Sequence, residues 1–232
     1  MDILIDNPSV ERDFKTILRR IQFLKSGDTV AQMKKLGLQY RINWGASIVS
    51  LRQLGKEYEP NHLLAMKLWN KQWRETMVLA SLLEIPQEMP EEQMDFWTKS
   101  LPTIEIAEQL VMNLFVHSDF AYVKAMEYCV GKKHLVRYSG IQLAGRLAMV
   151  DKKAIDDMFE PFFSLFHALI KDEALTQPLV RTLTIFVNRS EDLRQQTFNF
   201  LENVQRDEEG HARQLAMVLM TDFRQSSTTK NC

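Results

Sequence analysis

Apolar residues recur at helical spacing along almost the whole chain. Between residues 10 and 26 they form one stripe with basic residues on the opposite side, which predicts an amphipathic helix capped by Ser9. A short helix over 29–36 and a longer one over 44–58 follow, and Pro60 ends the latter because proline disfavours helix in the residue before it. The stripe comprises Val10, Phe14, Ile17, Leu18, Ile21 and Leu24, and the opposite side carries Arg12, Lys15 and Arg19.

From residue 61 onward the pattern predicts five pairs of helices joined by short connections. The second helices recur at intervals of about 30 to 44 residues, a period typical of helical-hairpin solenoids. One pair cannot bury its apolar face alone, so neighbouring pairs must stack and share a core. We therefore expect an all-α array whose second helices line a concave surface, in preference to a compact bundle of the same helices. The predicted pairs are 62–70 with 73–83, 91–99 with 103–115, 119–130 with 134–149, 154–171 with 178–187, and 191–203 with 208–223.

The length of 232 residues suits one large domain or two small ones. We predict a single repeat domain over residues 1–224, with N-terminal helices at 10–58 and repeat pairs at 61–223. Residues 225–232 are small and polar, and we expect them to form a flexible tail. Only 8 Gly and 7 Pro occur, too few for the many turns of an all-β chain.

The composition excludes several classes of protein. A hydrophobic fraction of 45% and a charged fraction of 25% are typical of a globular chain. The two cysteines, Cys129 and Cys232, provide no disulfide framework, which suits a reducing compartment. The first residues lack the basic start of a secretory signal, and no apolar run is long enough to span a membrane. We therefore expect a cytoplasmic protein that makes no membrane contact.

The sequence contains no complete set of metal ligands and no cofactor-binding motif. Glu208 and His211 have the spacing of half a di-iron site, but the other half is missing, so we interpret this segment as the solvated start of a helix. The chain contains no nucleophile elbow, phosphate loop or dinucleotide fingerprint. We therefore predict neither a metal nor a cofactor.

Charged residues recur near the starts of the predicted second helices. A basic segment at 131–134 precedes one of these helices, and Lys152 and Lys153 follow it. If the array curves, these side chains converge on the concave surface and can bind phosphates around a central carboxylate; the alternative is an ordinary solvated surface. The net charge of −1 argues against a strongly basic binder, although a neutral total can hide a basic face. The recurring residues are Glu75, Glu105, Glu108, Arg137 and Arg181.

Three groups of residues match the marker positions of a known family of helical-repeat proteins. The first group is 37–39 with 51–54, the second is 65–69 with 74, 75 and 80, and the third is 134–137 with 140 and 143. Over residues 33–223 the chain resembles the HEAT-like-repeat DNA alkylation repair proteins, the AlkD-like DNA glycosylases. The resemblance implies a right-handed α-solenoid of antiparallel helix pairs that forms a C-shaped concave groove around duplex DNA. It also implies removal of cationic alkylated purines such as 3-methyladenine and 7-methylguanine, which are already good leaving groups.

The resemblance places the family's catalytic aspartate on Glu108 and its phosphate-binding arginine on Arg137. The two tryptophans of the family cleft correspond to Ile104 and Ile185, so both aromatic surfaces for cation–π contact are missing. Glutamate in place of aspartate moves the carboxylate by about 1.5 Å, and a displacement near 1 Å can cost about a hundredfold in rate. We therefore expect weak or absent base excision. A shift of the alignment along this helix would give the role of Glu108 to Glu105.

The leading hypothesis is a DNA-binding HEAT-like-repeat protein of the alkylation repair family, either a divergent glycosylase or a binder that has lost the chemistry. We expect it to act as a monomer on duplex DNA, alkylated or distorted. The alternative is a non-catalytic scaffold that binds a protein or peptide, which the neutral net charge and the apolar Ile104 and Ile185 favour. The predicted DNA-binding residues are Lys132, Lys133, Arg137, Lys152, Lys153 and Arg181.

Overall fold

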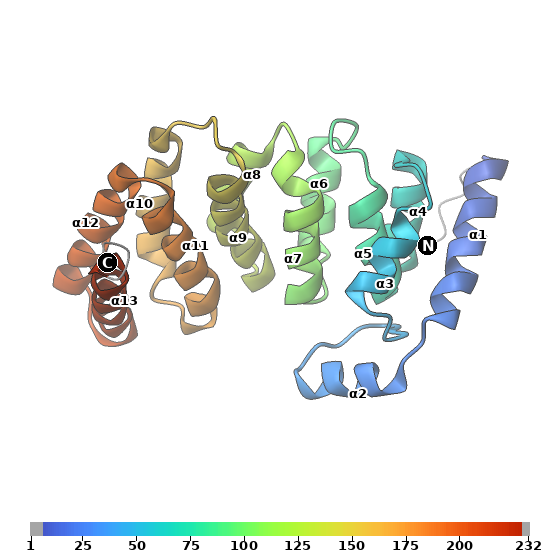
Figure 1. Cartoon of the computed structure of the whole chain (residues 1–232), viewed down its shortest axis with the longest axis horizontal. Coiled ribbons are helices and arrows are strands. Elements are labelled where there is room, and N and C mark those ends of the chain that lie inside the picture. The colour runs from blue at the N-terminus through green and yellow to red at the C-terminus, as the bar shows by residue number, and fades with distance from the viewer. Residues whose placement is uncertain (1–6, 229–232) are drawn as a thin grey trace. The chain divides into compact units, whose positions relative to one another are not determined.

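The computed structural model describes residues 7–228, and the side chains of residues 7–225. Within that range the chain is all-helical, with 13 α-helices, three short 3-10 helices and a single isolated bridge between Ile42 and Trp73 (Figure 1). The described residues divide into two compact units, unit 1 ending at Phe120 and unit 2 beginning at Ala121. The single domain expected over residues 1–224 stays a prediction.

Unit 1 consists of helices packed around α4 and α5. Asn61, which caps α4, donates its backbone N–H to the Leu83 carbonyl at the end of α5, so α4 and α5 are antiparallel. Helix α5 also contacts α3 and α7, and stacked Trp69 and Trp97 rings, with centroids 4.5 Å apart, join α4 to α6. The helices are α1 (Pro8–Phe23), α2 (Gly27–Lys35), α3 (Ile48–Gly55), α4 (His62–Lys71), α5 (Arg74–Leu83), α6 (Glu91–Lys99) and α7 (Ile104–Asn113), followed by η1 (Phe115–His117).

Unit 2 consists of two rows of helices. Helices α8, α10 and α12 contact one another in turn and form what we call the first-helix row, while α9, α11 and α13 form the second-helix row. The elements are α8 (Ala121–Cys129), α9 (His134–Val150), η2 (Asp156–Phe159), α10 (Glu160–Leu169), η3 (Glu173–Leu175), α11 (Thr176–Arg189), α12 (Glu191–Asp207) and α13 (Gly210–Thr228).

Small residues let the helices of unit 2 approach closely. A Cβ on Gly140 would lie 2.5 Å from the backbone nitrogen of Cys129, so α8 and α9 touch backbone to backbone there. On the other side of α9, Thr182 of α11 donates its hydroxyl to the Ile141 carbonyl at 2.9 Å. Helix α9 is therefore held between two neighbours and has little room for added volume.

Most of the apolar stripe predicted over residues 10–26 is buried, namely Val10, Phe14, Ile17 and Ile21. In unit 2, Phe159, Phe162 and Phe166 are fully buried, and their rings pack with Phe186 of α11 or with one another. No helix among the described residues is long and apolar enough to cross a membrane.

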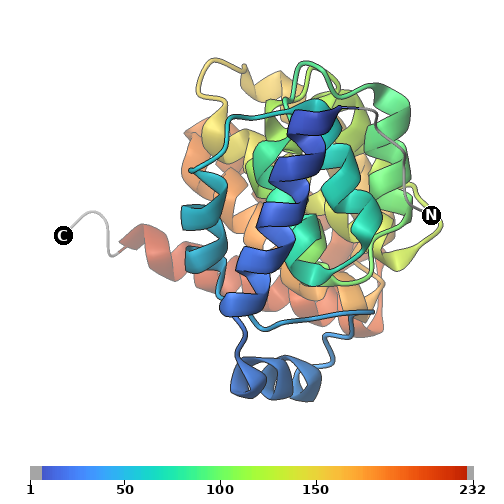
Figure 2. The same ribbon diagram turned by 90° about the vertical axis from the view of Figure 1, so that its right-hand side faces the viewer.

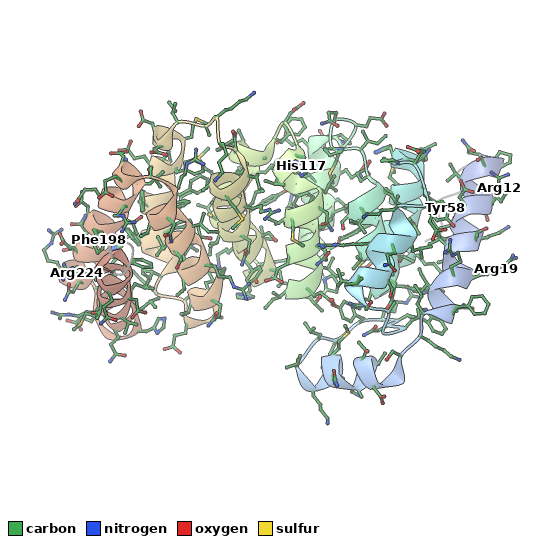
Figure 3. All side chains as sticks on the ribbon, in the orientation of Figure 1. Arg12, Arg19, Tyr58, His117, Phe198 and Arg224 are labelled. Carbon is green, nitrogen blue, oxygen red and sulfur yellow. The ribbon has the colours of Figure 1, made fainter. Side chains whose placement is uncertain are left out.

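The exposed side of α1 also agrees with the sequence pattern. Arg12, Lys15 and Arg19 are exposed, and Arg12 and Arg19 project away from the neighbouring helices (Figure 3). In unit 2, Arg224 of α13 lies over the Phe198 ring of α12 at 5.9 Å (Figure 3). The basic side chains at these two places are therefore at the surface of their own units.

Several helix ends differ from the sequence expectation. Helix α10 begins at Glu160 and not at residue 154, and α12 ends at Asp207 and not at residue 203. The helix expected from residue 44 begins at Ile48, because Gly45 has a left-handed φ of +76° and Glu75 holds this non-helical segment through the backbone N–H groups of residues 44–46. Helix α13 continues to Thr228, beyond the expected helix end at residue 223 and the expected domain end at residue 224. The remainder of the expected tail, residues 229–232, lies outside the described residues.

The close approach of α8 and α9 predicts a large cost for added volume at Gly140. We expect Gly140→Ala to destabilise the protein by about 1–3 kcal/mol, because the new methyl group would overlap backbone atoms of Cys129 and Ala125. Urea unfolding measures the change. Gly27→Ala is the control, since a Cβ there meets nothing within 4 Å, and an equal stability of both variants would contradict the packing argument.

Candidate functional site

Charge in unit 2 is divided between its two rows of helices. Helices α9 and α11 carry four arginines and no carboxylate. The first-helix row carries six carboxylates and three basic residues. The second-helix row is therefore the positive side of a chain whose net charge is only −1. The four arginines are Arg137, Arg146, Arg181 and Arg189.

The order of contacts shows that α9 and α11 run parallel. Along α9 the residues 137, 141 and 148 contact residues 172, 182 and 189 respectively, so the partner number rises together with the α9 number. Figure 1 shows the two helices side by side. Arginines on α9 and α11 are therefore spread along one layer of helices.

Arg137, the predicted phosphate ligand, is held by an ion pair. Its Nη2 donates to Asp172 Oδ2 at 2.9 Å and its Nη1 to the Lys132 carbonyl at 3.4 Å. Its Nε is buried, and no described residue accepts a hydrogen bond from it. Asp172 thus fixes the guanidinium at the start of α9 and offsets part of its charge.

Arg146 and Arg181 lie further along the same layer. Arg146 Nη1 donates to Met149 Sδ at 3.2 Å, and its buried Nε has no acceptor among the described residues. Arg181 is exposed on α11, as predicted for a DNA-binding residue. These two arginines give the layer its positive charge between the ends of α9.

Arg189 has a structural role that the sequence does not indicate. Only 8% of its side chain is exposed, and it donates to the carbonyls of Ala148 and Asp151 at 2.6 and 2.9 Å and to Asp156 Oδ1 at 3.1 Å. Its guanidinium also lies 4.8 Å from the centre of the Phe159 ring. Arg189 therefore fixes the loop that joins α9 to η2.

The four predicted lysines form two separate pairs. Lys132 and Lys133 precede α9, Lys152 and Lys153 follow it, and all four are exposed. Because α9 has 17 residues, about 25 Å separates its ends, so the two pairs cannot bind the same phosphate. The structure therefore places them at opposite ends of one helix.

Asp151 shapes the loop that presents Lys152 and Lys153. Its Oδ1 accepts the N–H groups of Lys153 and Ala154, both at 3.1 Å, and its Oδ2 accepts the Tyr122 hydroxyl at 3.1 Å. Burial alone would raise the pKa of Asp151, but these bonds hold it below the ordinary value. Burial, and then the carboxylate of Asp151, raise the pKa of Tyr122 to about 12.

The remaining predicted site residues lie on α7 of unit 1 and α11 of unit 2. Ile104 is 38% exposed at the start of α7, and Glu108 is half-buried one turn later, so both share a face of the helix. Ile185 is half-buried on α11. Glu108 therefore belongs to unit 1, whereas Arg137 belongs to unit 2.

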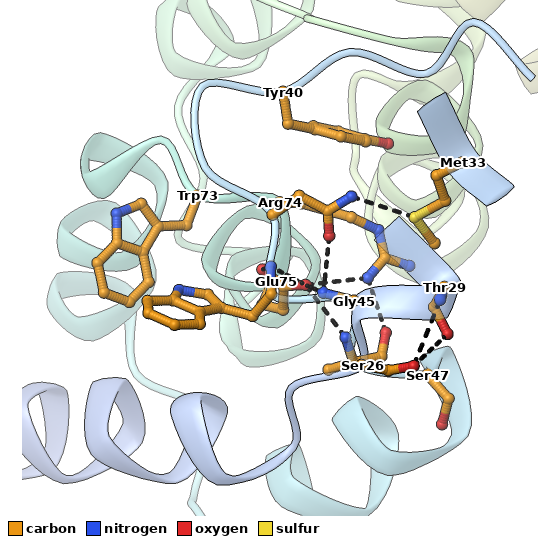
Figure 4. A network of polar contacts seen from close by, with 12 residues as sticks. Ser26, Thr29, Met33, Tyr40, Gly45, Ser47, Trp73, Arg74 and Glu75 are labelled. Atoms are coloured by element: carbon orange, nitrogen blue, oxygen red, sulfur yellow. Dashed lines mark hydrogen bonds and ion pairs between the residues drawn. The ribbon is translucent and has the colours of Figure 1, made fainter. Parts of the chain in front are cut away.

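A buried ionic network in unit 1 was not expected from the sequence (Figure 4). The Nε and Nη2 groups of Arg74 donate to the two carboxylate oxygens of Glu105 at 2.8 and 2.6 Å. Its Nη1 donates to the Ala46 carbonyl at 2.7 Å and to Glu75 Oε1 at 3.2 Å. The Tyr40 hydroxyl donates to Glu105 Oε2.

The expectation that Glu75 and Glu105 lie on a shared surface with the other charged residues is wrong. Glu75 is fully buried and accepts the backbone N–H groups of residues 44–46, and Glu105 is only 16% exposed. Burial alone would raise the pKa of Glu105, but hydrogen bonds from Arg74 and Tyr40 outweigh it and lower the pKa. Both carboxylates serve the fold of unit 1.

The 208–211 segment is also built differently from the expected solvated helix start. Glu208 is the C-cap of α12, and its Oε1 lies 3.1 Å from His167 Nε2 and 2.7 Å from Lys171 Nζ. His211 contacts the Thr176 hydroxyl instead, at 2.9 Å. Among the described side chains no group of three His, Cys, Asp or Glu residues could hold a metal ion.

A cavity of about 390 Å³ in unit 2 is separate from the predicted site. It lies between α10 and α12, and Phe163, His167 and Phe200 contribute to its lining. None of the predicted catalytic or DNA-binding residues lines it.

The arrangement of helices matches a known class of structure. A solved structure with TM-score 0.71 covers 90% of this chain and 94% of its own, at 16% sequence identity. It belongs to a new family of proteins related to the HEAT-like repeat DNA glycosylases, with affinity for branched DNA structures. No family model and no curated protein matches the sequence. The HEAT-like-repeat fold that the sequence resemblance implied is confirmed.

The network around Arg74 predicts a pH-dependent loss of stability. A carboxylate whose pKa is lowered in the folded state stabilises the fold above its ordinary pKa of about 4.3, and that stabilisation is lost as the pH falls through the lower folded value. We expect Glu105→Gln to cost about 3–5 kcal/mol at pH 7, because Arg74 loses a buried ionic partner. Urea unfolding at pH 7 and at lower pH should show a shallower acid dependence for the variant.

An exposed ion pair supplies the control. Arg20 and Glu57 also form a two-bond pair in unit 1, but their side chains are 42% and 50% exposed. Glu57→Gln should destabilise the protein far less than Glu105→Gln, because solvent screens an exposed ion pair. Equal costs for the two variants, or an unchanged acid dependence in Glu105→Gln, would be inconsistent with a buried network.

Proposed function

We propose that this protein binds DNA, branched DNA structures included, through the second-helix row of unit 2. The observation that carries the proposal is the segregation of charge, with four arginines and no carboxylate on α9 and α11. The HEAT-like-repeat fold supports it, because the similar solved structure comes from a family with affinity for branched DNA.

The chemistry of the layer suits a phosphate backbone. Guanidinium groups form two-bond contacts with phosphate oxygens, and exposed lysines add point charges. Arg146 and Arg181 occupy the middle of the layer, and the lysine pairs 132–133 and 152–153 stand at the two ends of α9. No base-reading group is needed for such binding, since backbone contacts supply orientation without sequence information.

Base excision is the finer function that the sequence resemblance implied. A glycosylase of this kind must stabilise the positive charge that grows on the sugar, and Glu108 is the carboxylate assigned to that task. Ile104 lies one turn away on the same face of α7 and is 38% exposed, where an indole would supply a cation–π surface. We therefore propose binding as the principal function, with Glu108 as the residue on which any excision would depend.

Salt-dependent binding tests the assignment of the second-helix row. Arg181→Ala should weaken binding to a duplex several-fold and reduce the slope of log K against log salt by about 0.9, the value for one lost phosphate contact. Arg206→Ala is the matched control, because Arg206 is exposed on α12 of the first-helix row and pairs with Asp207. Fluorescence anisotropy at about 50, 100 and 200 mM salt measures both.

Equal effects of Arg181→Ala and Arg206→Ala would argue against the second-helix row as the DNA-binding surface. Wild-type protein that binds no DNA at low salt would reject the proposed function altogether. Binding that does not change with salt would point to the apolar protein or peptide partner of the alternative hypothesis.

The catalytic assignment has its own test. We expect wild-type protein to release no more 7-methylguanine from alkylated duplex DNA than Glu108→Gln releases, because the aromatic surfaces for a cationic base are absent at Ile104 and Ile185. Chromatography of the released base measures the activity, and a binding assay on the same DNA confirms that both proteins bind. Release that Glu108→Gln abolishes would instead establish a glycosylase.

A further inference from the structure

Residues 25–46 form an excursion from unit 1 that we call the arm. It contains α2 and the extended segment that returns to α3, and Figures 1 and 2 both show α2 standing apart from the other helices of unit 1. None of residues 25–44 is buried. Burial of apolar side chains therefore does not explain what holds α2 in its position.

The arm is nevertheless fixed firmly at its base. The backbone N–H of Ser26 donates to the Trp44 carbonyl at 2.8 Å, so the two ends of the arm are joined to each other. The backbone N–H of Arg74 donates to the Ile42 carbonyl at 3.0 Å, and the Thr103 hydroxyl bonds to the Tyr40 hydroxyl at 2.8 Å. The returning segment is thus tied to α5 and to the start of α7.

The buried network completes this base (Figure 4). Glu75 accepts three consecutive backbone N–H groups of the returning segment, and Arg74 donates to its last carbonyl, that of Ala46. Gly45 has a φ of +76°, and a Cβ there would lie 2.2 Å from the Ser26 carbonyl oxygen. Buried charges and a left-handed glycine therefore serve to hold a segment in which none of residues 25–44 is buried.

The surface of the arm is strongly basic. It carries four basic residues and one acid, Asp28. All four basic side chains are exposed, and two of them, Lys34 and Lys35, are adjacent at the end of α2. Leu36 follows directly and is 78% exposed. The four basic residues are Lys25, Lys34, Lys35 and Arg41.

We propose that the arm is a second DNA-binding element and that it gives the protein a preference for branched over linear DNA. This proposal rests on the proposed function. Lys34 and Lys35 bind phosphates beside the branch point, and Leu36 packs against bases that are unstacked there. Apolar side chains next to basic residues are the usual means by which proteins contact opened base steps. A linear duplex offers phosphates but no open stack, so the contact of Leu36 is specific to the branch.

The experiment compares a four-way DNA junction with a linear duplex of the same sequence. Lys34→Ala with Lys35→Ala should weaken junction binding about tenfold and reduce its salt slope by about 1.8, the value for two lost phosphate contacts. Leu36→Ser should weaken junction binding several-fold and leave the salt slope unchanged, since no counterion is involved. Linear duplex binding should stay within about twofold of wild type in Leu36→Ser, and the double lysine variant should lose less affinity for the linear duplex than for the junction, because the second-helix row of unit 2 is intact.

A matched control removes the same charge elsewhere in unit 1. Lys15 on α1 and Lys99 on α6 are 62% and 61% exposed, and each pairs with an acid four residues earlier. Lys15→Ala with Lys99→Ala should bind the junction as the wild type does. None of the exchanged residues is buried, so circular dichroism should show unchanged folding in every variant.

The outcomes separate the two proposals. Junction binding that is unchanged in both arm variants, or equally weakened for junction and duplex, overturns the role of the arm while DNA binding itself stands. The role of the arm is also overturned if the control, Lys15→Ala with Lys99→Ala, loses as much affinity for the junction as Lys34→Ala with Lys35→Ala. The loss of positive charge anywhere on unit 1 would then explain the weaker binding. Wild-type protein that binds neither DNA overturns both proposals.

Discussion

The buried guanidinium of Arg74 is the constraint on which the rest of unit 1 depends. An arginine cannot lose its charge inside a protein, so burial to 1% exposure requires that its donors be satisfied. Glu105 satisfies two of them from α7, and the Ala46 carbonyl satisfies a third from the segment before α3. One side chain thereby fixes the relation of α5 to α7 and the path by which the arm returns. Hydrogen bonds from Arg74 and Tyr40 also keep Glu105 ionised, so the positive charge remains paired.

Unit 2 uses the same device at a different place. Arg189 ends α11 at 8% exposure and binds the carbonyls of the loop that follows α9, as Arg74 does for the segment that precedes α3. In both units a buried arginine on a second helix holds a connection whose own surface carries exposed lysines. Fixing such a connection in the free protein reduces the entropy that must be lost on binding. Lys34 and Lys35 in one unit, and Lys152 and Lys153 in the other, are therefore presented in defined positions.

Helical periodicity predicted most of the fold, because apolar residues that recur every three to four positions lie on the one face that each helix buries. It placed α6 at its observed bounds and most other helix ends within three residues, while the starts of α3 and α10 and the ends of α12 and α13 differ by four to six residues. The start of α3 could not be predicted, because Glu75 lies about thirty residues away in the sequence. Its hydrogen bonds to the backbone of residues 44–46 produce no local sequence pattern. The same limit applies to the site: periodicity places Glu75, Glu105 and Arg181 at similar turns of their helices, but only the structure shows that the two acids are buried and Arg181 is exposed.

The total charge of the chain is a poor guide to its partner for the same reason. A net charge of −1 suits an apolar or neutral ligand as well as DNA, but it averages over regions of opposite sign, among them an acidic first-helix row and an α9–α11 layer without a carboxylate. Screening limits the reach of exposed charges to about 8–10 Å, so a bound phosphate responds to the layer beneath it and hardly to acids on the far row. Asp172 and Asp156 neutralise part of that layer, which lowers its affinity for any polyanion. A second basic element outside the layer, such as the arm with its four exposed basic residues and one acid, then adds phosphate contacts that the partly neutralised layer does not supply.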